Sequence, residues 1–202
     1  ITKPIPILDC DREGRVWIVV GNNDVFCYDP HTRLIECRYK PRTTLRSLTT
    51  DKNGVIWFSG YGGGLYWTED GFEHVKPFLD AGGQEIYPKD IISYICLSDY
   101  NRMYLGLEEH GVAEVDLVTK TVTRLRLSDN PDAPLFVRHI LQYSADELWI
   151  GTESGIVVYN VRTRRYQHLQ SSLYDPYSLS DNAVYSLYKD REGGLWIGSF
   201  FG

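Results

Sequence analysis

The segment Asp190-Arg-Glu-Gly-Gly-Leu-Trp-Ile-Gly198 is the clearest copy of a pattern that returns along the whole chain. An acidic, glycine-containing turn leads into an aromatic residue and a short apolar run. The aromatic position recurs at Trp17, Trp57, Tyr104, Trp149 and Trp196, with spacings of 40, 47, 45 and 47 residues. A sustained period of this length indicates a repeat protein in which each period folds as one supersecondary unit.

Each period predicts four short strands. In the second repeat these are an inner strand at 45–50, a strand beginning at Trp57, a third strand at 64–67 and an outer strand at 72–78. The other inner strands are expected at 91–97, 137–143 and 183–188, and the other outer strands at 34–39, 121–127 and 165–169. No segment has a helical period, and four strands in about 45 residues predict a β-propeller blade.

The predicted fold is therefore all-β, a β-propeller fragment of four four-stranded blades plus the first half of a fifth. We predict a single partial propeller over 1–202, with blades at about 5–39, 42–78, 90–127, 137–169 and an incomplete 183–202. Open blade faces and a free strand edge invite pairing. We therefore expect either a piece of a longer chain or a chain that self-associates through its open faces.

Charge and composition argue against several classes of partner. The net charge is -6, and the densest basic patch, Arg162, Arg164 and Arg165, lies in a predicted hairpin turn. We expect no nucleic-acid partner, because phosphate binding needs a basic face. We also expect no direct membrane contact, because no apolar run approaches the length of a membrane span.

The cysteines and histidines predict neither a metal site nor a cofactor. Cys10, Cys27, Cys37 and Cys96 lack metal-site spacing and are interpreted as small buried hydrophobic residues. The sequence leaves open whether Cys27 and Cys37, on opposite arms of one predicted hairpin, form a disulfide. The histidines occupy different strand positions in the repeats: His31, His74, His110, His139 and His168.

Residues 178–199 closely resemble the two-component-regulator propeller repeat, and 11–18 and 149–159 match it well. The match is looser at 51–67, and Tyr104 replaces the tryptophan at 99–115. The resemblance implies a periplasmic sensor domain of a Bacteroides-type hybrid two-component system, which detects oligosaccharides from polysaccharide breakdown. It also implies a membrane-bound histidine kinase elsewhere in the parent chain, so we expect no enzymatic activity and no catalytic residue in these 202 residues.

A ligand would bind at the end of the blades where long loops gather. The loops that join successive blades are expected at 40–44, 77–90, 128–137 and 170–182, and the last three are longer than a turn requires. Sugars are bound by aromatic faces and by planar polar groups. The candidate ligand-binding residues are Arg46, Tyr61, Tyr87, Glu108, His110, Phe136, Arg138, Glu153 and Phe200.

Two alternatives to oligosaccharide sensing are weighed. The chain could be a protein-interaction propeller that dimerises through its open faces and binds no small ligand. It could instead be a propeller lyase or glycosidase, for which Glu108, Glu109 and His110 form the only nearby acid and histidine cluster. The repeated Asp-x-x-Gly segments are interpreted as strand-connecting turns rather than as calcium or acidic ligand sites.

Overall fold

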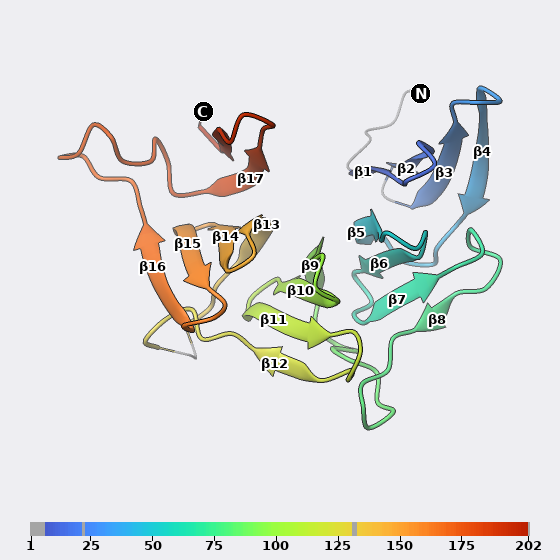
Figure 1. The fold of residues 1–202 in the computed structure, drawn as a ribbon, viewed down its shortest axis with the longest axis horizontal. Coiled ribbons are helices and arrows are strands. Elements are labelled where there is room, and N and C mark those ends of the chain that lie inside the picture. Colours follow the sequence, from blue (N-terminus) through green and yellow to red (C-terminus); the bar gives the residue numbers. More distant parts are fainter. Residues whose placement is uncertain (1–6, 22, 131–132, 202) are drawn as a thin grey trace. The chain divides into compact units, whose positions relative to one another are not determined.

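The computed structural model describes residues 7–21, 23–130 and 133–201. These residues form four four-stranded antiparallel sheets and one two-stranded sheet, and no helix occurs among them (Figure 1). Accordingly, no helix that is long and apolar enough to cross a membrane occurs among the described residues. The all-β prediction, with four complete four-stranded units and half of a fifth, is confirmed.

Strand neighbours follow chain order within every sheet. The first sheet contains β1 (Ile7–Cys10), β2 (Val16–Val20), β3 (Asp24–Asp29) and β4 (Leu34–Tyr39), and the second contains β5 (Leu45–Thr50), β6 (Ile56–Gly60), β7 (Leu65–Thr68) and β8 (Lys76–Pro77). The third contains β9 (Ile92–Leu97), β10 (Arg102–Leu107), β11 (Gly111–Asp116) and β12 (Val122–Arg124). The fourth contains β13 (Val137–Ser144), β14 (Glu147–Thr152), β15 (Gly155–Asn160) and β16 (Arg165–Leu169), and the last contains β17 (Val184–Lys189) and β18 (Leu195–Ser199).

The chain divides into two compact units, Ile1–Leu97 and Ser98–Gly202. Successive sheets pack face to face inside each unit. In the first unit, Trp17 and Val25 of the first sheet share a buried cluster with Leu48 and Phe58 of the second. In the second unit, Ile156 and Val158 of the fourth sheet pack against Val184 and Leu187 of β17. Stacking buries both faces of a sheet, which a four-stranded sheet cannot do by itself.

Burial falls from the middle of each sheet to its outer strand. Every residue of β6 is buried, as are all but one in β10, β11 and β15. The outer strands β4 and β16 are mainly exposed, and Tyr39 and Leu169 of these strands pack against the two core clusters. The inner and middle strands therefore form a rigid scaffold from which the loops at their ends project.

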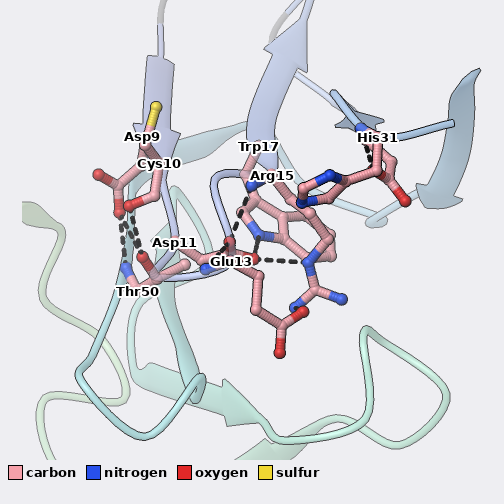
Figure 2. A network of polar contacts seen from close by, with 9 residues as sticks. Asp9, Cys10, Asp11, Glu13, Arg15, Trp17, His31 and Thr50 are labelled. Carbon is pink, nitrogen blue, oxygen red and sulfur yellow. Dashed lines mark hydrogen bonds and ion pairs between the residues drawn. The ribbon is translucent and has the colours of Figure 1, made fainter. Parts of the chain in front are cut away.

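The acidic turn of the repeat is stabilised by its aspartate side chain. Asp11 Oδ1 accepts the backbone N–H groups of Glu13 and Arg15 at 3.0 and 2.9 Å. Its Oδ2 accepts the indole N–H of Trp17 at 3.0 Å and Arg15 Nε at 2.8 Å (Figure 2). Burial raises the pKa of Asp11, but the hydrogen bonds from Arg15 and Trp17 outweigh it and hold the pKa below its ordinary value.

The same arrangement recurs in two other repeats. Asp51 accepts the indole N–H of Trp57 at 3.3 Å, and Asp190 accepts that of Trp196 at 2.8 Å. In each turn a glycine with positive φ donates its N–H to the aspartate carbonyl, which confirms that Asp-x-x-Gly is a strand-connecting turn. In the fourth sheet the indole of Trp149 bonds to Glu147 instead, at 2.7 Å.

Two outer strands are shorter than the sequence predicts. The segment 72–78 was expected to be a strand, but β8 contains only Lys76–Pro77. Gly71 and Phe72 both have positive φ, and the N–H of Phe72 bonds to Thr68 Oγ1. This turn directs the Phe72 ring into the core, where it stacks on Tyr39 with a centroid distance of 4.8 Å. The predicted strand 121–127 is likewise reduced to β12.

The interpretation of the cysteines as buried hydrophobic residues is wrong for two of the four. Cys27 is buried, Cys96 is half-buried, and Cys10 and Cys37 are exposed, all as free thiols. In the β3–β4 pairing, Cys27 lies opposite Glu36 and Cys37 lies opposite Phe26. Side chains alternate between the two faces of a strand, so Cys27 and Cys37 point to opposite sides of the sheet.

The aspartate–indole bond can be measured with a pair of matched variants. Asp80 forms the same turn as Asp51, accepting the N–H groups of residues 82 and 84 at 2.8 and 2.9 Å, but no tryptophan follows it. We expect Asp51→Ala to lower the free energy of unfolding by about 1 kcal/mol more than Asp80→Ala does, the net contribution of one hydrogen bond. Urea denaturation measures both. Equal losses would mean that the indole bond contributes nothing.

His139 on β13 predicts an acid-dependent loss of stability. Burial lowers its pKa from an ordinary 6.5 to about 4, so the unfolded chain takes up a proton at higher pH than the folded chain. The free energy of unfolding should therefore fall as pH drops from about 6.5 to about 4, by up to about 3 kcal/mol. His139→Gln should lose this slope in pH-dependent denaturation. The exposed His110→Gln should keep it, and an unchanged slope in both would contradict the assignment.

Candidate functional site

Several candidate residues lie directly after the second strand of a sheet, next to the start of the inner strand of that sheet. A backbone bond fixes the chain there in three sheets: Tyr61 N–H to the Thr44 carbonyl at 3.0 Å, Glu153 N–H to the Phe136 carbonyl at 3.2 Å, and Phe200 N–H to the Ala183 carbonyl at 3.0 Å. The residue just after the second strand is thus held beside the start of the inner strand. Tyr61, Glu153 and Phe200 occupy equivalent positions in the repeat.

A β-bulge lies beside each of these positions. The register of the inner hairpin shifts between Leu45 and Ser47, between Val137 and His139, and between Val184 and Ser186. The bulged residues are Arg46, Arg138 and Tyr185, each the second residue of its inner strand. A bulge leaves one residue outside the ladder and re-aims its side chain, which is why bulges are frequent next to binding sites.

In the first unit the bulged Arg46 contacts Tyr61. Arg46 Nη1 donates to the Tyr61 hydroxyl at 3.2 Å, and its guanidinium carbon lies 4.9 Å from the centre of the Tyr61 ring. About half of the Tyr61 surface remains exposed. The neighbouring 40–44 loop borders a cavity of about 400 Å³, whose lining includes Arg42, Thr43 and Tyr66. The pair presents an oriented cation and an accessible aromatic ring.

In the second unit five side chains form a continuous surface, which we call the Arg138 surface: Arg138, Glu153, Tyr185, Phe200 and Phe201. Arg138 forms an ion pair with Glu153, and its guanidinium carbon lies 5.5 Å from the centre of the Tyr185 ring. The Tyr185 and Phe200 centroids are 6.0 Å apart, and Phe200 meets Phe201 edge to face at 4.9 Å. Tyr185, Phe200 and Phe201 are 45, 65 and 84 % exposed.

Arg138 is held in place by both of its neighbours. Its side chain is about three-quarters buried, whereas that of Glu153 is 37 % exposed. A guanidinium group held by a carboxylate on one side and an aromatic ring on the other has lost most of its rotamer freedom. It can therefore donate hydrogen bonds to a ligand with a reduced entropic cost. The surface joins an ordered donor and acceptor pair to exposed aromatic faces.

The remaining predicted residues, Tyr87, Phe136, Glu108 and His110, lie in loops and turns between strands. The carbonyls of Tyr87, His110 and Phe136 accept hydrogen bonds from Gly64, Arg124 and Glu153 respectively. Tyr87 itself has a φ of 49°, a left-handed conformation that is unusual for an aromatic residue. Glu108 is half-buried and His110 is exposed at the β10–β11 turn, where His110 also lines a cavity of about 530 Å³. Their role in ligand binding stays a prediction.

Sequence reasoning missed Tyr185 and Phe201. Tyr185 stands at the same place in β17 as Arg138 does in β13, so aligning the inner strands could have found it. Phe201 follows Phe200 directly and has no counterpart of its kind at the other hairpin ends, where Gly62 and Ser154 stand. Its contribution is apparent only from the ring contact with Phe200.

Two further groups combine acidic side chains with a histidine: Asp70, Glu73 and His74, and the predicted cluster of Glu108, Glu109 and His110. Asp70, Glu73 and His74 are exposed and bring their ligand atoms close together. The Asp70 oxygens accept the His74 backbone N–H, the Thr68 hydroxyl and the His74 ring, and these bonds hold the pKa of Asp70 well below its usual range. The cluster is thus explained by a turn. In the cluster of Glu108, Glu109 and His110, the backbone carbonyl of Glu109 accepts a hydrogen bond from the N–H of Leu135 at 3.0 Å.

Comparison with known proteins identifies a family that matches part of the chain and a relative of low sequence identity. Residues 178–201 match the family described as two component regulator propeller. Histidine kinase P4 of Formosa agariphila is 23% identical over 187 residues, which are 89% of this chain and 13% of that protein.

Solved structures share the fold. The extracellular domain of a B. thetaiotaomicron protein described as a hybrid two component system superposes with a TM-score of 0.76 at 16% identity, over 95% of this chain and 25% of that one. A second such domain from B. thetaiotaomicron gives 0.70 at 18% identity, over 95% of this chain and 27% of that one. PorZ, a surface component of the type-IX secretion system of Porphyromonas gingivalis, gives 0.72 at 17%, over 97% and 31%.

The chain spans about an eighth of the curated relative and a quarter to a third of these solved chains. The family match covers the segment in which the sequence resemblance is strongest, and it confirms that resemblance. Residues 178–201 are therefore a two-component regulator propeller repeat, and the chain that carries this repeat is a run of β-propeller blades.

Proposed function

We propose that this chain is part of the extracytoplasmic ligand-sensing domain of a hybrid two-component sensor, and that it binds an oligosaccharide released from a polysaccharide. The observation that carries the proposal is the Arg138 surface, in which a bulged arginine is oriented between a carboxylate and an exposed aromatic ring. The chain would transmit binding across the membrane to a histidine kinase in another part of the parent protein.

The chemistry of the surface suits a sugar. A pyranose ring presents apolar C–H faces and, around its edge, hydroxyl groups that both donate and accept hydrogen bonds. Tyr185 and Phe200 offer exposed ring faces, Arg138 offers fixed donors, and Glu153 offers an acceptor. All of these groups come from two successive sheets of one unit, so a ligand of several sugar residues could contact both sheets.

The relatives support the sensory part of the proposal. Two of the similar structures are extracellular domains described as belonging to hybrid two component systems, and the curated relative is named a histidine kinase. Loops on a rigid scaffold commonly carry binding function, and the candidate residues lie at loop positions fixed by backbone hydrogen bonds. Catalysis has no part in the proposed function, which needs only differential binding to two signalling states.

A screen of oligosaccharides with variants of the Arg138 surface tests the proposal. A bound glycan should raise the melting temperature, with a stabilisation of about 2.7 kcal/mol at a hundred times its Kd. Arg138→Ala should weaken the binding at least tenfold, because it removes charge-assisted hydrogen bonds. The variant should lose no more than about 1 kcal/mol of stability, as is usual for a partly exposed ion pair. Tyr185→Ala should also reduce the affinity.

Tyr188→Ala is the matched control, because Tyr188 is an exposed tyrosine on the same strand, outside the Arg138 surface. Binding that is weakened by Arg138→Ala and Tyr185→Ala but not by Tyr188→Ala would support the site. Glycan binding that all three variants retain would remove the Arg138 surface from the proposal. A cooperative melt that no glycan shifts would count against oligosaccharide sensing by this chain.

Self-association is the second candidate function, and the β17–β18 sheet favours it. Trp196 keeps its bond to Asp190 but is 65 % exposed, whereas the equivalent Trp17 and Trp57 are 3 and 7 % exposed. Within the described part of the chain, no strand pairs with the outer edge of β18. Two such two-stranded sheets, joined through β18, would form one four-stranded sheet that covers these edges.

Light scattering over a concentration series measures this association. If β18 pairs between two copies, the chain should be dimeric, and Ile197→Lys should make it monomeric, because a charge on a strand face and edge opposes pairing. Val118→Lys, at an exposed turn of the same unit, is the control and should leave the dimer intact. A monomeric wild-type protein at every concentration would exclude this function.

A further inference from the structure

The third sheet departs from the repeat at its centre. Tyr104 stands where the other sheets have tryptophan, and Glu114 is its partner in the β10–β11 register. The residues in the same register position elsewhere are Cys27, Trp67 and Val158. Glu114 is nevertheless buried, with 6 % of its surface exposed. A buried carboxylate in an apolar position is costly unless it is paired, so its partners identify what the substitution achieves.

Two arginines hold the Glu114 carboxylate. Arg102 Nη1 of β10 lies 2.6 Å from Oε1, and Arg164 Nη1 of the β15–β16 turn lies 2.7 Å from Oε2. Hydrogen bonds with Tyr159 and Glu114 raise the pKa of Arg164 above its ordinary value. One carboxylate therefore fixes two guanidinium groups, each of which engages it through one terminal nitrogen and has further N–H groups directed elsewhere.

These arginines line a cleft of about 490 Å³, which is within the size range of small-molecule sites. A third arginine, Arg162, also lines it and forms an ion pair with Asp146 at 3.2 Å. The wall is completed by Tyr100, Gln142 and Ser98 among others. Three guanidinium groups thus meet at the cleft, where Glu114 and Asp146 pair with them and Asp116 lies opposite Arg102 in the β10–β11 register.

The geometry points to an oxyanion site: we propose that this cleft binds a sulfate or carboxylate group, held by Arg102, Arg162 and Arg164. Glu114 is a positioning residue that orders two of these arginines in advance and so lowers the entropic cost of binding. Arginine forks match the oxygen spacing of sulfate and carboxylate, and they remain charged at any physiological pH. The site accounts for Arg162 and Arg164 of the basic patch and for the altered repeat around Tyr104.

The cleft is separate from the Arg138 surface. Asp146 of the cleft directly precedes β14, and Glu153 of the Arg138 surface directly follows it. The six residues of β14 place these ends about 20 Å apart at 3.3 Å per residue. The oxyanion site therefore does not rest on the proposed oligosaccharide function, and either can fail without the other.

An NMR titration of the whole chain with sodium sulfate tests the site, with sodium chloride at equal ionic strength as the blank. Sulfate stabilises proteins generally, so a residue-resolved signal is needed rather than a melting temperature. We expect saturable shifts of the arginine Nε–H signals, with a Kd on the order of 1 mM. Sodium glucuronate is titrated in parallel, so that the stronger binder distinguishes a sulfate from a carboxylate ligand.

Arg162→Gln is the main variant because it leaves the Glu114 bridge intact, and it should weaken the tighter anion about tenfold through loss of one charge-assisted contact. Arg191→Gln, an exposed arginine in another turn of the same unit, should leave the affinity unchanged. Shifts that do not saturate for either anion, or an Arg162→Gln variant that binds as the wild type does, would overturn the proposal.

Discussion

The hydrogen bond between a turn aspartate and the indole of the following tryptophan is the polar interaction that recurs most in the repeats, in the first, second and fifth sheets. One carboxylate closes the turn through two backbone N–H groups and holds the indole through its second oxygen. The bond satisfies the polar atom of a large aromatic side chain that must otherwise be buried with an unpaired donor. It allows tryptophan to fill the space between stacked sheets, and that stacking buries the faces of every complete sheet.

A repeated scaffold of this kind separates stability from recognition. The turn aspartates and the middle strands are fixed by packing, whereas the bulged residue and the residue after the second strand are free to vary. The three sheets use these two positions differently, with Arg46 and Tyr61, then Arg138 and Glu153, then Tyr185 and Phe200. The same backbone geometry thus presents a cation and ring, an ion pair, and two rings.

The sequence predicts the fold well because its signals are local. The Asp-x-x-Gly turn, the aromatic anchor and the period each depend on neighbouring residues. The turn is present in the first, second and fifth repeats, and the aromatic anchor and the period persist through all five. The predicted length of the outer strand at 72–78 was wrong because Gly71 and Phe72 both have left-handed backbone conformations. They form a turn where a strand was predicted, and this turn buries Phe72. Cys37 was misassigned because it lies on the outer strand β4, where five of the six residues are exposed whatever their polarity.

The candidate surfaces were predicted less completely, since they depend on contacts between segments distant in sequence. The sequence indicates that Arg46 and Arg138 stand early in their strands, but it does not reveal the β-bulges that redirect their side chains. Tyr185 lies 47 residues from Arg138, and Arg164 lies 50 residues from Glu114, so neither contact has a local signature. The third repeat was recognised as altered, although only the structure places the buried carboxylate there.

A crystal structure of the protein with an oligosaccharide that it binds would test the central claim most directly. We expect sugar density stacked on Tyr185 and Phe200, with hydroxyl groups within hydrogen-bond distance of Arg138 and Glu153. Ordered sugar density elsewhere on the chain, with the Arg138 surface unoccupied, would contradict the claim that the bulged arginine and its aromatic neighbours form the ligand site.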